Sequence, residues 1–479
     1  MVTKENKSEV SRVGLVLITV YCLTPVAGQV VKTGRLRLTA EPSLQERSGS
    51  ARARDCEARA CPLPQSAVSP DSITSPLLAA NPQNPMQLLG AANDASCEFS
   101  ELGSYVSEDG GTTWTTVCTQ LADSNDPALA YGYGTAYVAT AYGGDPGYVE
   151  AQTSQDGGLT WSSRVTVARS LLGGDVNLAW AEVDNNASSP YENSVYLSVT
   201  QFDTKVVDSE ISVSHSSDNG NTWTTTTVDP VQIKPVVDQF SRLTIGSDGT
   251  VFVAWQRCVM TGSNINCAGT KAEMLLAKSS DGGNTWSTPV TIATVNLVPD
   301  TCDCAFFGNL PLTYEQVANM PLIGIDNSSG AHARNLYAVL YNWTGTQMKV
   351  EVATSSNGGS TWGKPLPVAP AARHDEFFPT LSVSPSGAVG VSWLDRRNDP
   401  RNIKYQPYAA ESTDGGATFS KSYPVTSYLS DPYLDGNGGT YMGDYTGNAW
   451  NGDGTFLVTW PDTRNLQFMQ DYIGGFEVE

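Results

Sequence analysis

The sequence predicts an all-β fold: a β-propeller of four-stranded blades, with seven blades favoured and six as the alternative. An eight-residue phrase, Ser-x-Asp/Asn-x-Gly-x-Thr-Trp/Phe, occurs six times in the 479 residues. Each copy follows two apolar segments that are separated by a turn-forming stretch. Two hairpins make a four-stranded sheet, and sheets repeated around a ring leave few exposed strand edges. The repeats therefore predict one large propeller.

We call the repeated phrase the box; its copies span residues 107–114, 154–161, 216–223, 279–286, 355–362 and 412–419. Each box predicts a tight turn between two strands, because Asp-Gly and Asn-Gly pairs readily adopt the positive φ angles that such turns need. The Ser hydroxyl and the Asp carboxylate can bind the amides of the turn itself. We expect the aromatic residue to pack against a neighbouring sheet. Asn357 and Phe419 replace Asp and Trp in single boxes and preserve these roles.

The apolar hairpins upstream of the boxes recur seven times, at residues 77–94, 126–142, 178–199, 241–255, 320–341, 378–393 and 442–460. Seven inner hairpins favour seven blades, whereas six would result if the 77–94 unit were an addition to the ring. No box follows the last copy, which ends in the strand-like segment 471–478. An N-terminal strand is the expected completion of this last sheet.

The formal charge of −21, from 28 basic and 49 acidic residues, argues against binding to nucleic acid or to anionic membranes. An acidic substrate would need a local basic pocket. Basic residues and an apolar run precede Gly28, which predicts a cleaved secretory signal at 1–28 and a secreted protein, extracellular or periplasmic, without membrane insertion. We expect a flexible leader at 29–70, a single propeller domain at 71–479, and a monomer.

Eight cysteines remain after the predicted signal, and an even number in an exported chain favours disulfides. We expect neighbours to pair, as 56–61, 97–118 and 258–267. Cys302 and Cys304 would form a strained ring with one another, and the rival hypothesis, a metal site, finds no His nearby. We expect no cofactor; the Asp-rich turn 435–444 is a weak calcium candidate whose spacing does not fit an EF-hand.

The boxes resemble the Asp-box (BNR) repeats of the sialidase superfamily of propellers, and the resemblance covers residues 75–479. It implies a glycan-active protein, and in its sialidase-like form a glycoside hydrolase that binds a carbohydrate or glycoconjugate. Enzymes, binding proteins and receptors all carry such boxes, so the resemblance is specific for fold and weakly specific for activity.

Strand parity predicts where a site would lie. Strands alternate in direction within a blade, so the turns that hold the boxes share one face with the turns between strands 1 and 2. Residues just before strand 1 and just after strand 2 must therefore lie on the opposite face. Charged and phenolic residues collect at those positions: Asp126, Asp175, Asp238, Arg242, Arg257, Arg373, His374, Asp375, Glu376, Asp395, Arg396, Arg397, Tyr441, Asp444, Tyr445, Asp462 and Arg464.

Glycosidases commonly need a carboxylic acid of raised pKa and a second group as base or nucleophile. By resemblance, sialidases use an Asp acid/base, a Tyr nucleophile assisted by Glu, and three arginines that grip a carboxylate. The candidates in this chain are Asp375 or Asp395 for the acid, Tyr445 or Tyr441 for the nucleophile, and His374 as a further catalytic residue. The substrate-binding candidates are Arg242, Arg396, Arg464, Asp238 and Asp444.

One departure from the family weakens the sialidase hypothesis. Sialidases carry an Arg-Ile-Pro motif before the first box, where this chain has SPLLAANP at 75–82. Structural roles also compete: Asp126 and Asp175 can accept turn amides, and the Asp–Arg pairs after strand 2 can be salt bridges between blades. Two further functions therefore stay open, a polysaccharide lyase that uses His374 or a Tyr as base on a uronate, and a non-catalytic glycan- or protein-binding propeller.

Overall fold

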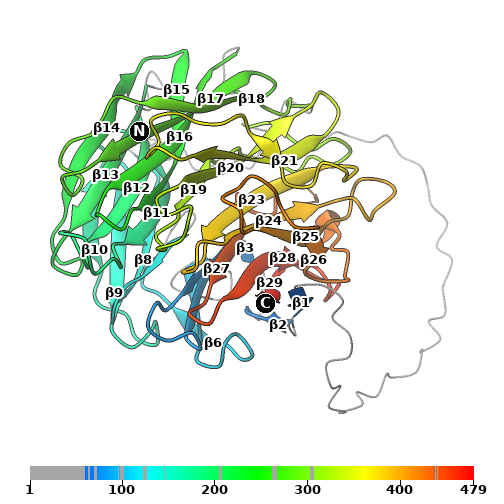
Figure 1. Ribbon diagram of the computed structural model, residues 1–479, viewed down its shortest axis with the longest axis horizontal. Coiled ribbons are helices and arrows are strands. Elements are labelled where there is room, and N and C mark those ends of the chain that lie inside the picture. The colour runs from blue at the N-terminus through cyan, green and yellow to red at the C-terminus, as the bar shows by residue number, and fades with distance from the viewer. Residues whose placement is uncertain are drawn as a thin grey trace, which may run out of the picture.

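The computed structural model describes residues 60–62, 65–69, 73–94, 97, 102–121, 127–144, 146–203, 208–261, 267–301, 307–436, 438–439 and 441–478. Seven antiparallel sheets stand around a ring, in the order of the chain (Figure 1). The predicted all-β propeller with seven blades is confirmed, and the 77–94 hairpin belongs to a full blade rather than to an addition.

The blades are numbered here along the chain. Blade 1 holds β3 (Ile73–Ala80), β4 (Leu88–Asp94), β5 (Leu102–Ser107) and β6 (Thr115–Cys118). Blade 2 holds β7 (Pro127–Tyr131), β8 (Ala136–Tyr142), β9 (Tyr148–Ser154) and β10 (Val165–Arg169). Blade 3 holds β11 (Val176–Val183), β12 (Val195–Phe202), β13 (Ser209–Ser216) and β14 (Thr224–Gln232). Blade 4 holds β15 (Val236–Ile245), β16 (Val251–Val259), β17 (Lys271–Ser279) and β18 (Val290–Asn296).

Blade 5 holds β19 (Leu322–Ile325), β20 (Leu336–Trp343), β21 (Met348–Ser355) and β22 (Leu366–Pro367). Blade 6 holds β23 (Glu376–Val383), β24 (Val389–Asp395), β25 (Gln406–Ser412) and β26 (Tyr423–Pro424). Blade 7 holds β27 (Gly447–Trp450), β28 (Thr455–Asp462) and β29 (Gln470–Val478), joined by β1 (Ala60–Pro62) and β2 (Ser66–Ala67). One short 3-10 helix, η1 (Pro432–Leu434), precedes blade 7.

Blade 7 closes the ring with strands from both ends of the described chain. Strands β1 and β2 pair antiparallel with β29, so that Ala60 faces Val478 and Ser66 faces Ile473. An N-terminal strand thus completes the last sheet, as expected. Part of the interval predicted as leader therefore belongs to the propeller, whereas the predicted signal at 1–28 lies outside the described residues.

Each box forms the turn between the third and fourth strands of its blade. In the first box, Asp109 Oδ1 accepts hydrogen bonds from the Ser107 hydroxyl (2.9 Å) and from the Thr113 amide (2.8 Å). The Gly111 amide donates to Ser107 Oγ (2.8 Å). Two indoles donate to the preceding blade: Trp161 Nε1 to Ser104 Oγ (3.0 Å) and Trp286 Nε1 to Thr226 Oγ1 (3.0 Å). The predicted role of the box as a turn with an aromatic plug is confirmed.

Four inner strands share an irregularity that the sequence does not reveal. Strands β3, β11, β15 and β23 each carry a β-bulge near the start of the strand. The first inserted residue has a positive φ and is not glycine: Ser75 (53°), Leu178 (50°), Phe240 (64°) and Phe378 (47°). Leu178 and Phe240 are buried in one hydrophobic cluster that gathers inner strands from several blades. Apolar side chains therefore fill the centre of the ring near the starts of these strands.

Two disulfides are present among the described residues, Cys97–Cys118 and Cys258–Cys267. Both match the expected pairing of neighbours and are compatible with an extracellular protein. The predicted 56–61 pair and the 302–304 segment lie outside what the structure describes. No helix in the described part of the chain is long and apolar enough to span a membrane.

Candidate functional site

Among the described residues, the charged side chains predicted on one face lie on the side of the propeller away from the boxes. The boxes fill the turns between strands 3 and 4, and the predicted side chains stand just before or within strand 1, or near or just after the end of strand 2, of their blades. We call this side the loop face. Asp126 lies outside the described residues, and Asp175 accepts hydrogen bonds from the amides of Gly144 (3.2 Å) and Val176 (3.0 Å), which is the structural role weighed for it.

In blade 6, Asp395 pairs with Arg397. Asp395 Oδ2 accepts hydrogen bonds from Arg397 Nε (2.8 Å) and from the indole of Trp393 (2.8 Å), and the Arg397 amide donates to Oδ1 (2.7 Å). The Arg397 guanidinium lies 4.0 Å from the ring centroid of Tyr408. The fully buried Asp395 carboxylate therefore accepts hydrogen bonds from three groups close to it in sequence: the Trp393 indole, the Arg397 guanidinium and the Arg397 amide.

Blade 7 repeats the arrangement residue for residue. Asp462 accepts from the Trp460 indole (2.9 Å) and from Arg464 Nε (2.9 Å), and Arg464 lies 4.0 Å from the centroid of the Tyr472 ring. The shared pattern is Trp-x-Asp-x-Arg, and its arginine in blade 6 is Arg397, two residues after the aspartate. The interpretation that paired Asp395 with the adjacent Arg396 was wrong, because the partner of Asp395 is the next residue, Arg397. Each salt bridge joins residues of a single strand end within one blade, and not two blades.

Asp238 and Arg257 form a similar pair across β15 and β16. Arg257 Nε and Nη2 each donate to one oxygen of Asp238 at 2.7 Å, and Nη2 also reaches Asp229. Burial raises the pKa of Asp238 to about 6, although the Arg257 guanidinium opposes the shift. The buried carboxylate of Asp238 thus forms a bidentate salt bridge with Arg257.

Arg242 and Tyr445 meet at the centre of the ring. The Arg242 guanidinium lies 4.7 Å from the Trp180 ring centroid and 5.5 Å from that of Tyr445. The Tyr445 hydroxyl donates to the carbonyl of Pro127 (2.8 Å). Both side chains are almost fully buried. The structure therefore brings these two predicted residues together, beneath the apolar side chains that fill the centre.

A group of acidic side chains gathers where two loops of the loop face meet. Glu315 precedes blade 5 and is fully buried; its Oε1 accepts a hydrogen bond from the Met442 amide (2.7 Å), which precedes blade 7. Glu315 Oε2 is buried without a hydrogen-bond partner among the described residues. Burial and the nearby charge of Asp435 raise the pKa of Glu315 well above its usual range. Glu315 therefore favours its protonated form more strongly than a solvent-exposed glutamate does.

A tyrosine and a second carboxylate lie beside this glutamate. The Tyr441 hydroxyl donates to Asp444 Oδ2 (3.3 Å), and the charge of Asp444 contributes to the raised pKa of Glu315. Tyr441 is half-buried, and it is thus more accessible than Tyr445. We call Glu315, Tyr441 and Asp444 the acid cluster. Sequence reasoning identified the last two residues but missed Glu315, although it stands in the searched position before an inner strand.

Arg396 connects the acid cluster to blade 6. Its guanidinium is fully buried, 3.9 Å from Asp375 Oδ2, and Nη2 donates to Thr313 Oγ1 (2.9 Å). Asp375 also accepts a hydrogen bond from Asn402 Nδ2 (2.6 Å), and the half-buried His374 places Nδ1 3.2 Å from the Arg396 carbonyl oxygen. His374 has a φ of 69°. Among the interactions of the described residues, none joins two of the three predicted clamp arginines, Arg242, Arg396 and Arg464.

The turn proposed for calcium uses its first aspartate internally. Asp435 accepts hydrogen bonds from the amides of Gly439 (3.0 Å) and Tyr441 (3.2 Å). No group of three or more His, Cys, Asp or Glu side chains in the described ranges is arranged to hold a metal ion.

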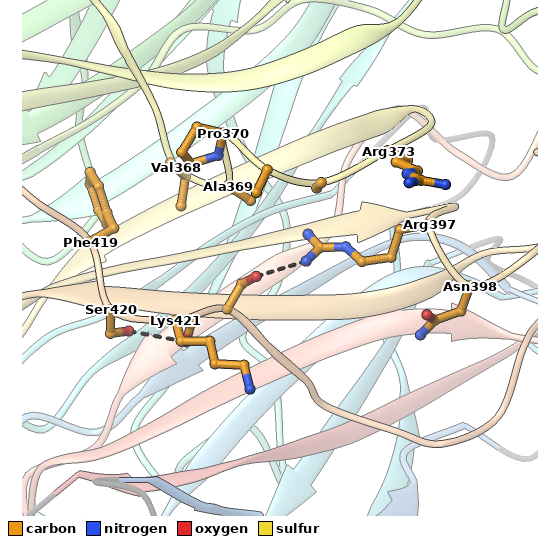
Figure 2. Close-up of a pocket in the computed structure, with 12 residues that line it drawn as sticks. Val368, Ala369, Pro370, Arg373, Arg397, Asn398, Phe419, Ser420 and Lys421 are labelled. Carbon is orange, nitrogen blue, oxygen red and sulfur yellow. Dashed lines mark hydrogen bonds between the residues drawn. The ribbon is translucent and has the colours of Figure 1, made fainter.

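A basic groove opens between blades 5 and 6, beside His374. It has a volume of about 560 Å³ and is lined by residues 368–373, 397–398 and 419–422 (Figure 2). Arg373, Arg397 and Lys421 are the charged residues of this lining. Arg373 and Lys421 are exposed, and neither forms a salt bridge with another described residue. A chain with a charge of −21 thus holds one local concentration of positive charge suited to an anion.

Comparisons with known proteins place the chain by fold. No protein-family model matches the sequence, and no curated protein matches it. Among solved structures, a polysaccharide lyase described as an ulvan lyase of a new family matches with a TM-score of 0.50 and 12% identity, over 83% of this chain and 93% of the lyase. These values establish a shared β-propeller fold.

Two glycosidases are more distant. An intramolecular trans-sialidase from Ruminococcus gnavus has a TM-score of 0.44 and 12% identity, over 69% of this chain and 91% of its own. An α-L-arabinofuranosidase from Fusarium graminearum has a TM-score of 0.45 and 10% identity, over 87% and 98%.

Proposed function

We propose that this protein is a secreted glycan-active enzyme that works on the loop face, and that it cleaves glycosidic bonds by hydrolysis. The observation that carries the proposal is the acid cluster: burial raises the pKa of Glu315, whose carboxyl binds the Met442 amide, and the adjoining Tyr441 is hydrogen-bonded to the carboxylate of Asp444. A neutral carboxylic acid and a second, basic group are the two parts that glycoside hydrolysis requires.

The chemistry assigns a role to each group. Glu315 would give its proton to the leaving glycosidic oxygen as the bond from the anomeric carbon to that oxygen breaks. Tyr441 would add its phenolic oxygen to the anomeric carbon, with its proton passing to Asp444, and water would then release the sugar. The reaction needs no cofactor.

The remaining candidates fit supporting roles in this scheme. The Arg396 guanidinium lies 3.9 Å from Asp375, and the Arg242 guanidinium lies 5.5 Å from the ring centroid of Tyr445. Asp395, Arg464 and Asp238 are each bound in an ion pair. We therefore propose Glu315 for the acid in preference to Asp375 or Asp395, and Tyr441 for the nucleophile in preference to Tyr445.

A polysaccharide lyase is the second candidate, and the basic groove favours it. Arg373 and Lys421 could neutralise the carboxylates or sulfates of an acidic glycan, as the substrate of an ulvan lyase would require. His374 follows Arg373 directly and is half-buried, so it is placed to act as the base. A lyase breaks the chain by elimination and leaves an unsaturated sugar.

Product analysis separates these functions. The purified protein is incubated with sialosides, uronate-containing polysaccharides and neutral glycans, and both new reducing ends and ultraviolet absorbance are followed. Reducing ends without absorbance support hydrolysis, an absorbing product supports the lyase, and neither signal on any substrate supports a binding protein.

Variants then test the site itself. Glu315→Gln and Tyr441→Phe are expected to lower the detected activity by about 10²–10⁴-fold, the usual contribution of a general acid–base group. Tyr433→Phe is the matched control, because Tyr433 is an exposed tyrosine of the same loop whose hydroxyl donates to the Leu312 carbonyl (3.2 Å). Loss of activity in Asp375→Asn and Tyr445→Phe, with Glu315→Gln and Tyr441→Phe unaffected, would return the site to the residues of the initial hypothesis.

A further inference from the structure

A second cavity, of about 580 Å³, occupies the central channel on the side of the boxes. Its wall is made by the later residues of inner strands from six blades and by the turns that follow them, including Tyr133, Asn185 and Asn327. The acid cluster and the basic groove contribute none of these lining residues. This box-side cavity is therefore separate from the candidate active site, and nothing in the proposed reaction uses it.

The cavity contains one charged residue. Glu182 lies on β11, two residues after Trp180, and both side chains line the cavity because alternate residues of a strand share a face. Among the described lining residues, Glu182 is the only one with a formal charge. Burial raises the pKa of Glu182 to about 8. A partly buried carboxyl group with a raised pKa thus lines a cavity that offers it no cation among the described lining residues.

The asparagines of the wall present further acceptors. Asn185 Nδ2 donates to the Tyr131 carbonyl (2.8 Å), Asn327 Nδ2 to that of Ile245 (2.9 Å), and Asn448 Nδ2 to that of Thr380 (2.9 Å). These bonds fix which end of each amide is nitrogen. The side-chain oxygens of Asn185 and Asn448 accept no hydrogen bond from any described residue, and Asn448 is only 8% exposed.

An apolar and aromatic surface completes the wall. Trp180, Trp450 and Tyr131 all line the cavity, and the Trp450 indole N–H already donates to the Ser382 carbonyl (3.2 Å). A ligand that fits such a wall has a flat or apolar body. It also carries N–H donors, because the unpaired groups around it are acceptors and a buried acceptor gains from each donor it meets.

We propose that the box-side cavity binds a small organic cation, an amidinium or ammonium group on an apolar or aromatic body, through Glu182 and the asparagine oxygens. Ionised Glu182 forms a charge-assisted hydrogen bond with the cation, and the aromatic side chains hold the body. The cavity is within the usual size range of small-molecule sites.

Benzamidine and benzamide test the proposal, because they have nearly the same shape and only benzamidine is a cation. Isothermal titration calorimetry of the full chain should give benzamidine at least a tenfold lower Kd than benzamide. Glu182→Gln should remove this preference. Glu192→Gln is the matched control, because Glu192 is an exposed glutamate in the next turn of the same blade and outside the cavity lining.

A second measurement reports on Glu182 directly. Because the carboxyl is mostly protonated at pH 7, benzamidine binding should release close to one proton, which appears as a buffer-dependent heat. Glu182→Gln should release none.

The proposal is overturned if benzamidine does not bind, if benzamide binds equally well, or if Glu182→Gln retains the preference. Should Glu182→Gln fail to fold, the benzamidine-to-benzamide ratio and the proton release of the unaltered protein decide the question.

Discussion

The box offers a sharp test, because the chain carries both versions of its acidic position. In blade 4, Asp281 Oδ1 accepts hydrogen bonds from the Ser279 hydroxyl (2.7 Å) and from the Thr285 amide (2.9 Å), and Oδ2 accepts from the Thr285 hydroxyl (2.6 Å). In blade 5, Asn357 Oδ1 accepts the equivalent bonds from Ser355 and Thr361, but its Nδ2 donates to the Thr361 hydroxyl (2.8 Å). An amide therefore makes the contacts to Ser and Thr without the charge; Asp281 Oδ1 additionally accepts from the Asn284 amide (3.1 Å).

This comparison sets the size of the expected effects. Asp281→Asn should lower the free energy of unfolding by about 0.5 kcal/mol, because only the charge assistance of exposed hydrogen bonds is lost. Asp281→Ala removes every bond and should cost about 1–2 kcal/mol. Asn357→Asp should be neutral or slightly stabilising at pH 7. Guanidinium unfolding, followed by tryptophan fluorescence, measures all three against the unaltered chain.

The pH dependence gives a second, independent readout. Hydrogen bonds from the Thr285 side chain and amide lower the pKa of Asp281 to about 2 from its usual 3.8. A lowered pKa in the folded state stabilises the protein above the unfolded value, and that stabilisation disappears as the pH falls from about 4 to about 2. The difference between Asp281→Ala and the unaltered chain should therefore narrow across this window. A difference that stays constant with pH, or an Asp281→Asn variant as unstable as Asp281→Ala, would refute the reasoning.

Three further predictions concern the scaffold and the channel. Arg397→Ala or Arg464→Ala should lower the free energy of unfolding by about 3 kcal/mol, because each removes the salt-bridge partner of a buried aspartate. Arg164→Ala, which breaks the exposed 3.3 Å pair with Glu150, is the control and should cost less than about 1 kcal/mol. Thermal unfolding measures all three variants. Replacing both Cys97 and Cys118 by Ser, which opens a loop with a sequence separation of 21, should cost about 3 kcal/mol in denaturant unfolding, and an unchanged midpoint would contradict the pairing. Because the pKa of Glu182 is raised to about 8, its contribution to stability is present below about pH 4.5 and is lost as the pH rises to 8. Glu182→Gln should therefore be more stable than the unaltered chain at pH 8 by about 1–3 kcal/mol. If the variant and the unaltered chain are equally stable at both pH 5 and pH 8, the burial of this carboxyl is contradicted.

The fold was predictable because its signals are local and repeated. The Asp-Gly turn of each box and the alternation of apolar strands are properties of short segments, so six boxes and seven hairpins fix the blades and the face on which the loops lie. The disulfides Cys97–Cys118 and Cys258–Cys267 were also accessible, because their cysteines are neighbours in the chain.

The arrangement within the loop face was less predictable, because it depends on contacts between distant loops. Glu315 meets Met442 across more than a hundred residues, and its burial cannot be inferred from either segment. The residues with a positive φ in two of the bulges are Leu178 and Phe240, and because neither is glycine, the sequence does not indicate this backbone conformation. The register of the Asp395 pair was missed because Arg396 and Arg397 are adjacent, and only the packing of Arg397 on Tyr408 distinguishes them.

Recurrence separates scaffold from function on the loop face. The Trp-x-Asp-x-Arg unit forms the same contacts at the end of the second strand in two successive blades. An arrangement that recurs at the same place in different blades is explained by a structural role in the blade. The same argument gives the six boxes a structural role. Glu315, by contrast, has a buried oxygen without a hydrogen-bond partner among the described residues, and its cluster draws on loops before blades 5 and 7. A buried carboxyl group with an unpaired oxygen lowers stability relative to an apolar residue, so its presence is better explained by chemistry at the site than by folding.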